Sequence, residues 1–206
     1  MSIFDSRART WDANPMHMDR SLAIVEAMKK SIDFTKTYEA LEYGAGTGNL
    51  SFLLKDSVSK ITTMDSSREM VKIMNEKLIS MNITNVHPMF YDLETTDYNE
   101  KTFDLIYMQM VLHHVNKLSP FLKKCNMLLN TGGILSIADL YKEDGLFHGT
   151  GFTGHQGFDI PELSQILIDA GFSNIKEEKC YQMEKLLDNG EKRSYPIFLL
   201  TAVKAK

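Results

Sequence analysis

The sequence has few cysteines and no long hydrophobic run. Its two cysteines, Cys125 and Cys180, do not form a short-spaced pair and cannot hold a metal cluster by themselves, so we expect free thiols in a reducing, cytoplasmic compartment. No stretch approaches the ~20 consecutive apolar residues that cross a bilayer. The first segment carries charges and no apolar run. These absences argue against a membrane span, a signal peptide and an anchor.

The chain also lacks an excess of positive charge. It has 23 Lys and Arg against 27 Asp and Glu, which gives a net charge of −4, whereas nucleic-acid binders are usually basic. Its 206 residues, 43% hydrophobic and 24% charged, are typical of a soluble globular domain that buries a core without disulfides. We therefore expect a single domain over residues 1–206 and no nucleic-acid partner.

Segments that read as strands alternate with helical patterns along most of the chain. The predicted strands are 38–43, 61–64, 86–91, 103–108, 133–138, 173–180 and 195–203. The predicted helices are 16–32, 49–58, 67–81, 119–129 and 160–170. Gly171 is well placed to end the last helix. This alternation predicts an α/β domain with a mainly parallel sheet covered on both faces.

A glycine-rich turn containing Gly44, Gly46 and Gly48 joins the first predicted strand to the next helix. Glycines there allow positive φ and the close approach of a ligand, although an ordinary tight turn has the same pattern. A dinucleotide site would need a third glycine at Asn49. Glu42, before the turn, favours a cationic ligand over a pyrophosphate. Both residues weigh against a nicotinamide-dependent oxidoreductase, which stays an alternative.

Acidic residues follow the next two predicted strands. Asp65 lies 19 residues beyond Gly46, where a carboxylate can accept hydrogen bonds from ribose hydroxyls. Asp65 or Ser66 can also cap the following helix, and both uses are compatible if Ser66 is the cap. Asp92 can accept from an exocyclic amine, and Leu93 can cover a base. Because carboxyl ends of parallel strands meet at one edge, these residues predict a nucleoside site.

Three further segments complete a family pattern. They are Phe103-Asp104-Leu105-Ile106, Val111-Leu112-His113-His114-Val115 and Leu129-Asn130-Thr131-Gly132-Gly133. With the glycine-rich turn and the acidic residues, they resemble the class I S-adenosylmethionine (SAM)-dependent methyltransferases, most of all the small single-domain enzymes that methylate small molecules. The likeness covers about residues 38–140, and 195–203 resembles the family's final antiparallel strand. It implies a Rossmann-like, mainly parallel seven-stranded sheet with one antiparallel strand and helices on both faces.

The resemblance also implies which residues bind the cofactor. They are Glu42, Gly44, Ala45, Gly46, Gly48, Asp65, Ser66, Asp92, Leu93 and Gln109. The glycine-rich turn would pack against the methionine and ribose portions, and Asp65 would hold the ribose hydroxyls. Asp92 would hold the adenine amine, Leu93 the adenine ring, and Gln109 the methionine end by its backbone.

Two segments flank this predicted site. Residues 1–36 resemble the family's N-terminal helical cover, in which Trp11 either closes over the cofactor or packs on the first helix. Residues 141–160 form an acceptor-side loop, whose portion 145–157 contains five glycines. A loop of that length is more often functional than not. We expect it to act as a mobile lid over the acceptor pocket.

Histidines are the candidate proton acceptors. Methyl transfer from a sulfonium depends on alignment and exclusion of water, and needs a general base only where the acceptor must lose a proton. We predict that His148 and His155, in the acceptor-side loop, are catalytic residues directed at the acceptor. His113 and His114 read instead as a structural pair. We expect no metal, because no cysteine or third histidine lies near the loop histidines in sequence.

Signatures of nucleic-acid methylation are missing. Gln109, Met110 and Val111 stand where methyltransferases of exocyclic base amines carry an Asn-Pro-Pro-Tyr segment, and no cysteine lies there to attack a pyrimidine. The sequence therefore predicts methyl transfer to a small-molecule acceptor in the cytoplasm. A non-catalytic or regulatory SAM-binding protein and a macromolecular methyltransferase remain alternatives.

Overall fold

The computed structural model describes residues 3–35, 37–149, 151–187 and 190–205. Residues 1, 2 and 36 of the expected cover and residue 150 of the expected loop lie outside the described residues. The α-helices are α1 (Ile3–Arg7), α2 (Pro15–Ser31), α3 (Asn49–Leu54), α4 (Arg68–Ser80), α5 (Leu118–Leu128) and α6 (Ile160–Asp169). The 3-10 helices are η1 (Ala8–Ala13), η2 (Lys55–Ser57) and η3 (Leu112–His114). The strands are β1 (Glu39–Tyr43), β2 (Lys60–Asp65), β3 (Val86–Phe90), β4 (Phe103–Gln109), β5 (Leu129–Leu140), β6 (Phe172–Leu186) and β7 (Lys192–Lys204).

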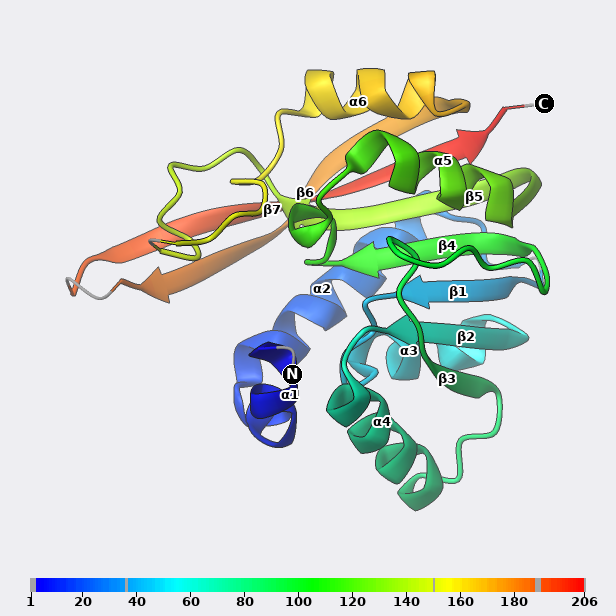
Figure 1. Cartoon of the computed structure of the whole chain (residues 1–206), viewed down its shortest axis with the longest axis horizontal. Coiled ribbons are helices and arrows are strands. Elements are labelled where there is room, and N and C mark those ends of the chain that lie inside the picture. The colour runs from blue at the N-terminus through cyan, green and yellow to red at the C-terminus, as the bar shows by residue number, and fades with distance from the viewer. Residues whose placement is uncertain (1–2, 36, 150, 188–189, 206) are drawn as a thin grey trace.

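These strands form one seven-stranded sheet in the order β3-β2-β1-β4-β5-β7-β6. The pairs from β3 to β5 are parallel, whereas β7 is antiparallel to both β5 and β6. Figure 1 shows helices on both faces of the sheet. Pro88, which cannot donate a ladder hydrogen bond, lies in the edge strand β3, where it is tolerated. The predicted fold class, with its one reversed strand, is confirmed.

The last two strands are longer than the sequence pattern predicted. Their pairing continues to Leu186 and Lys192, well beyond Leu140 and Ile197, where β5 stops pairing with β7. The hairpin therefore projects past the other strands, as Figure 1 shows. Most β6 side chains are exposed or half-buried, so this stretch lacks the hydrophobic alternation by which a strand is recognised.

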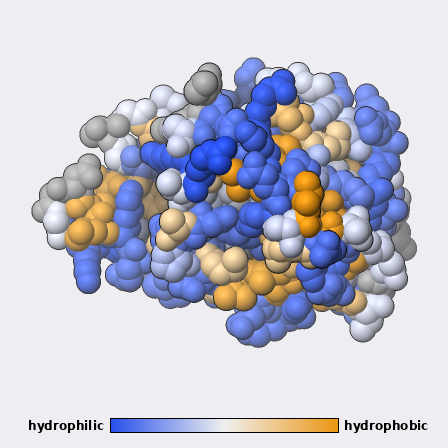
Figure 2. Space-filling model, turned by 90° about the horizontal axis from the view of Figure 1, so that it is seen from below, coloured by the Kyte–Doolittle hydropathy of each residue, from blue (hydrophilic) through white to orange (hydrophobic). Residues whose placement is uncertain are grey.

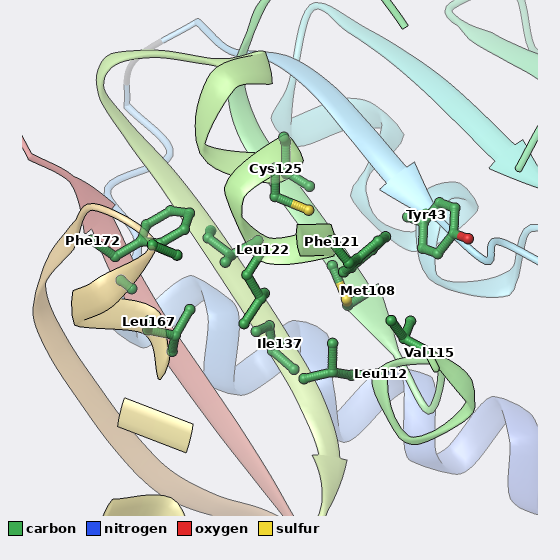
Figure 3. Packing of buried hydrophobic residues seen from close by; sticks show 14 of the residues in the cluster. Tyr43, Met108, Leu112, Val115, Phe121, Leu122, Cys125, Ile137, Leu167 and Phe172 are labelled. Atoms are coloured by element: carbon green, nitrogen blue, oxygen red, sulfur yellow. The ribbon is translucent and has the colours of Figure 1, made fainter. Parts of the chain in front are cut away.

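Two hydrophobic clusters hold the layers together, one on each face of the sheet. Under α5 and α6, the Phe121 and Tyr43 rings lie with their centroids 4.9 Å apart, and Leu122 lies near Ile137 (Figure 3). On the opposite face α2, α3 and α4 contribute Ile24, Met28, Leu50, Leu54 and Met74. Burying one large aliphatic or aromatic side chain contributes about 1.5–3 kcal/mol. Both helical layers are thus fixed to the sheet.

Local capping sets where the helices begin. The Asn14 side chain accepts a hydrogen bond from the Met16 amide at 3.1 Å, with Pro15 in the first turn of α2. Asp159 caps α6 by accepting from the Glu162 amide at 3.1 Å. These carboxamide and carboxylate oxygens satisfy amides that have no partner within the helix. Gly171, with φ of 90°, follows Ala170, the C-cap residue of α6, and ends the helix as predicted.

Within the described ranges, no helix is long and apolar enough to cross a membrane, and both cysteines are free thiols. Figure 2, which views the molecule from the side of α4, shows hydrophilic residues over much of this face with hydrophobic ones between them.

Candidate active site

A cavity of about 670 Å³ lies at the carboxyl ends of the parallel strands. Open α/β sheets bind ligands at this edge, and the volume is typical of small-molecule sites. The cavity is bounded by the segments that follow β1 to β4, by the N-terminal helices, by the loop after β5 and by β6. In Figure 1, α1 lies beyond the arrowheads of β1 and β4.

The glycine-rich turn after β1 forms one wall of the cavity. Gly44 and Gly46 have positive φ values of 67° and 55°. A Cβ on Gly44 would lie 2.3 Å from Cγ2 of Val111, so the space admits only a glycine. The Gly44 amide donates to the carbonyl of Met64 at 2.7 Å, which ties the turn to β2. Gly44, Ala45 and Gly46 all line the cavity.

Asp65 lies at the end of β2 and faces the same wall. Its Oδ2 accepts from the Gly46 amide at 2.7 Å, and its Oδ1 accepts from the Ser67 amide at 2.8 Å. Burial raises the pKa of Asp65, while the hydrogen bonds from Ser67 and Gly46 lower it. The helix cap is Ser67, whose Oγ accepts from the Met70 amide, and not Ser66 as expected. Ser66 instead lines the cavity beside Asp65.

Asp92 lines the cavity beyond β3, but Leu93 does not. The Asp92 carboxylate accepts from the Tyr43 hydroxyl at 3.1 Å and from the Glu94 amide at 2.9 Å. Leu93 is 1% exposed and packs in the core under α5 and α6. The expected contact of Leu93 with the adenine ring is therefore corrected: the turn after Asp92 directs this side chain inward.

Glu42 and Gly48 also lie outside the cavity, contrary to expectation. Glu42 is fully buried on the α3 side, where Ser51 donates a hydrogen bond to its carboxylate. The Ser51 hydroxyl also lies 2.8 Å from the Tyr107 hydroxyl. Because successive residues of a strand face opposite sides of the sheet, the Glu42 side chain points toward α3 and not into the cavity. Burial raises its pKa to about 8. Gly48 precedes α3 and packs near Phe52.

Two carboxylates fasten the N-terminal cover over the glycine-rich turn. Asp12 accepts from Thr47 Oγ1 at 2.7 Å and from Lys77 Nζ at 2.9 Å. Asp5 accepts from Ser67 Oγ at 2.6 Å, which joins α1 to the start of α4. Trp11 lines the cavity and stacks on the His17 ring at 4.3 Å. Trp11 thus both faces the pocket and packs on α2, and its closure over the cofactor stays a prediction.

Gln109 lines the cavity at the end of β4. Its side chain is engaged with α2, because its amide nitrogen lies 3.0 Å from the Ser21 hydroxyl. The next residue, Met110, has a positive φ of 54°, and its amide donates to the Ala138 carbonyl at 2.8 Å. The backbone therefore turns sharply here, and a contact through the backbone of Gln109 stays a prediction.

His113, His114 and His148 line the other end of the cavity and meet there. His113 is 1% exposed, and its Nδ1 lies 2.6 Å from Oδ1 of Asp139, at the end of β5. Asp139 also accepts from the amides of His113 and Leu140 at 3.2 and 2.7 Å. The predicted structural pair is thus part of the pocket wall, where it meets His148, which is distant from it in sequence.

Two of these imidazoles are neutral at pH 7. Burial, together with the neighbouring histidines, lowers the pKa of His114 to about 3. The His148 ring is partly exposed at the cavity edge, but it stacks on Phe152 at 4.0 Å. Burial, and then the charges of His113 and Lys185, lower its pKa to about 4. A proton acceptor works best with a pKa near the operating pH, so His148 is a weak general base.

His155 does not line the cavity, which corrects its expected catalytic role. Its Nε2 lies 3.0 Å from the Val115 carbonyl, and its amide donates to the His113 carbonyl at 2.8 Å. His155 therefore anchors the acceptor-side loop to the segment after β4. Two aromatic residues that flank this loop also lie outside the cavity: Phe158 is a core residue, and Tyr141 bonds to Glu177.

Three cations near the histidines were not found from the sequence. Arg20 of α2 is 6% exposed and lines the cavity, and burial lowers its pKa to about 10, so it stays protonated. Lys185 of β6 and Arg7, the last residue of α1, also line the cavity. Arg20 belongs to a helix whose sequence pattern is otherwise amphipathic. Lys185 belongs to the extension of β6 that the sequence did not predict. No local pattern could have assigned them.

Comparison with known proteins identifies the family. A model of the methyltransferase domain matches residues 41–137. The chain is 31% identical to an uncharacterized methyltransferase of Staphylococcus carnosus over 190 residues, which cover 86% of each protein. It is 30% identical over 152 residues to an uncharacterized methyltransferase of Schizosaccharomyces pombe, covering 66% of this chain and 54% of that protein. The chain thus spans about half the length of the S. pombe relative.

Solved structures agree on the fold. A SAM-dependent methyltransferase of Thermotoga maritima, described as a possible histamine N-methyltransferase, has a TM-score of 0.71 and 17% identity, with 98% of each chain covered. The chain belongs to the class I SAM-dependent methyltransferases, and its cofactor is SAM. The nicotinamide-dependent alternative is thereby left without support.

Proposed function

We propose that this methyltransferase acts on an anionic small molecule bound at the histidine end of the cavity. The observation that carries the proposal is the opposite charge of the two ends. Asp65 and Asp92 line the end beside the glycine-rich turn, whereas Arg20 and Lys185 line the end beside the histidines. A cationic cofactor and an anionic acceptor would each meet complementary charge.

The residues of the first end fit SAM, which carries a sulfonium and an ammonium and supplies an electrophilic methyl group when bound. Each Asp65 carboxylate oxygen accepts a hydrogen bond from one backbone amide. Each keeps a second lone pair that can accept from a ribose hydroxyl. At Gly46 the nearest atom to a Cβ would be Nε1 of Trp11 at 4.0 Å, so the backbone there is open to close approach. Trp11 and Phe4 of the N-terminal cover line the same cavity and would exclude water from the reacting atoms.

The surroundings of the second end support a small acceptor. Phe4 and Arg7 bound it on the side of the N-terminal cover, and Phe147 and His148 bound it on the side of the loop. The net charge of −4 disfavours nucleic acid, whose binding requires neutralised phosphates. The free thiols favour a reducing compartment, so we also place the reaction in the cytoplasm.

A ligand screen tests this proposal. Protein saturated with S-adenosylhomocysteine is heated with small carboxylates and phosphates and with neutral amides of matched size. We expect only anionic compounds to raise the melting temperature, since they alone complement Arg20 and Lys185. Compounds that stabilise the protein are then incubated with SAM, and formation of S-adenosylhomocysteine is measured.

Charge-removing variants sharpen the test. Arg20→Gln and Lys185→Gln should each raise KM for an anionic acceptor about tenfold, a loss of about 1.4 kcal/mol, with a smaller change in kcat. Lys192→Gln is the control, because Lys192 is exposed on β7 and outside the cavity. Equal stabilisation by the neutral amides would contradict an anionic acceptor. Tight cofactor binding without turnover across the panel would favour the non-catalytic alternative.

A further inference from the structure

Three histidines from two separate segments converge at the acceptor end of the cavity. His113 and His114 belong to η3 after β4, and His148 belongs to the loop after β5. One ring nitrogen from each lies within 4.8 Å of the other two. The ring centroids are 4.2, 5.0 and 5.1 Å apart.

His113 is held in the orientation of a metal ligand. Its Nδ1 lies 2.6 Å from the fully buried carboxylate of Asp139. A carboxylate accepts hydrogen bonds, so Nδ1 is the donor, and in the neutral ring Nε2, across from it, keeps a lone pair. Nε2 is buried and has no hydrogen-bond partner among the described residues. Metal-bound histidines typically donate their second nitrogen to a carboxylate in this way.

We propose that His113, His114 and His148 bind one divalent transition-metal ion, with a fourth coordination position open toward the acceptor. Three imidazoles with one open position form the ligand set of catalytic Zn²⁺ sites, and imidazole also suits Cu, Ni and Fe. Tetrahedral bonds of about 2.0–2.1 Å place the nitrogens about 3.4 Å apart. Nitrogens that lie within 4.8 Å of one another must therefore close by at most about 1.4 Å. His148, on the loop at the cavity edge, is the ligand that makes this movement.

The role of the ion rests on the proposed function. An acceptor thiol or hydroxyl at the open position releases its proton to water, because the bound cation stabilises the resulting anion. The acceptor atom then forms a bond to the methyl carbon, and the electron pair of the broken carbon–sulfur bond stays on the sulfur. Asp139 offsets part of the positive charge that the ion adds beside Arg20 and Lys185.

Metal titration tests the site without any turnover. Tag-free, chelator-treated protein is saturated with S-adenosylhomocysteine and titrated with Zn²⁺ in a calorimeter, and the visible spectrum is recorded with Co²⁺. We expect one ion per chain and the strong absorption of tetrahedral Co²⁺. His148→Ala and His114→Ala should weaken Zn²⁺ binding by about a hundredfold or more, and Asp139→Asn by about tenfold to a hundredfold. His87→Ala, an exposed histidine of β3, is the matched control and should bind normally.

The outcomes separate this inference from the proposed function. Zn²⁺ affinity that is the same in the wild type, His114→Ala and His148→Ala would overturn the metal site. So would protein that binds S-adenosylhomocysteine but no Zn²⁺, and this result would leave the proposed function standing. The metal site would be supported if the wild type binds one Zn²⁺ per chain and His148→Ala loses this ion while it still binds S-adenosylhomocysteine. Zn²⁺ binding by protein that fails to bind S-adenosylhomocysteine would contradict the proposed function alone.

Discussion

The two ends of the cavity are built in different ways. At the cofactor end, Gly44, Asp65 and Asp92 each stand at or just after the end of a strand, and backbone hydrogen bonds hold them. The acceptor end is assembled from α2, η3, the loop after β5 and β6, which are far apart in sequence. The first end therefore follows from the sheet, while the second depends on how long segments pack over it.

The two ends also differ in what fixes their side chains. Asp65 is locked by two backbone amides at 2.7 and 2.8 Å. Lys185 of β6 reaches the carbonyl of Phe147 in the loop after β5, and His148 stacks on Phe152 within that same loop. Ligand specificity can change at the acceptor end without disturbing the sheet, because few sheet residues take part.

The largest expected effect is at the glycine-rich turn. Gly44→Ala adds a methyl group 2.3 Å from Cγ2 of Val111 at a residue with positive φ. Backbone strain and overpacking together should cost about 2–6 kcal/mol of stability, and binding of S-adenosylhomocysteine should be lost. Thermal unfolding and calorimetric titration measure the two effects.

A matched glycine separates the clash from the strain. Gly132 also has a positive φ, 76°, but a Cβ at this residue would have no neighbouring atom within 4 Å. Gly132→Ala should therefore cost only the strain, about 1–3 kcal/mol, and leave cofactor affinity unchanged. Equal losses in the two variants would show that the contact with Val111 is unimportant.

The next effect is expected at Asp65. Asp65→Ala removes the ribose acceptor and leaves the amides of Gly46 and Ser67 without their partner. We expect S-adenosylhomocysteine affinity to fall about tenfold to a hundredfold, or about 1.5–3 kcal/mol. Asp56→Ala, an exposed carboxylate of η2, is the control in the same calorimetric titration. Undiminished binding by Asp65→Ala would remove this residue from the cofactor site.

The same contrast explains how much the sequence could predict. The succession of strands along the chain, the turn at Gly44 and the placement of Asp65 were accessible because each depends on residues close in sequence. Leu93 was misplaced, because spacing cannot tell which side of a turn a residue faces. Asp139 follows Ala138, which pairs with Gln109 at the end of β4. The register of these two strands would therefore have placed Asp139 beside the predicted site. The meeting of His148 with His113 could not be predicted, because it depends on the path of a long loop.

Replacing Glu42 tests whether this buried carboxylate lies outside the cofactor end of the cavity. Its pKa of about 8 lies above the ordinary 4.5, so the folded chain binds more protons than the unfolded chain between these values. Stability contributed by this group is present at low pH and is lost as pH rises toward 8. Glu42→Gln should therefore raise the melting temperature at pH 8 more than at pH 5, at about 2–4 °C per kcal/mol.

Cofactor affinity should not change in this variant, because Glu42 lies outside the cavity. Glu39→Gln, at the exposed start of the same strand, is the control variant. A loss of S-adenosylhomocysteine binding in Glu42→Gln, with the fold intact, would return this carboxylate to the cofactor site.

The smallest effect is expected at His155. His155→Ala removes one hydrogen bond to the Val115 carbonyl, while the backbone bond from residue 155 to His113 remains. The stability loss should be about 0.5–1.5 kcal/mol, measured by denaturant unfolding. Turnover should change little, because the His155 ring does not line the cavity, whereas His148→Ala should reduce turnover. If instead His155→Ala lost a hundredfold in kcat at unchanged stability, the ring would act on the acceptor, and the loop would have to move during the reaction.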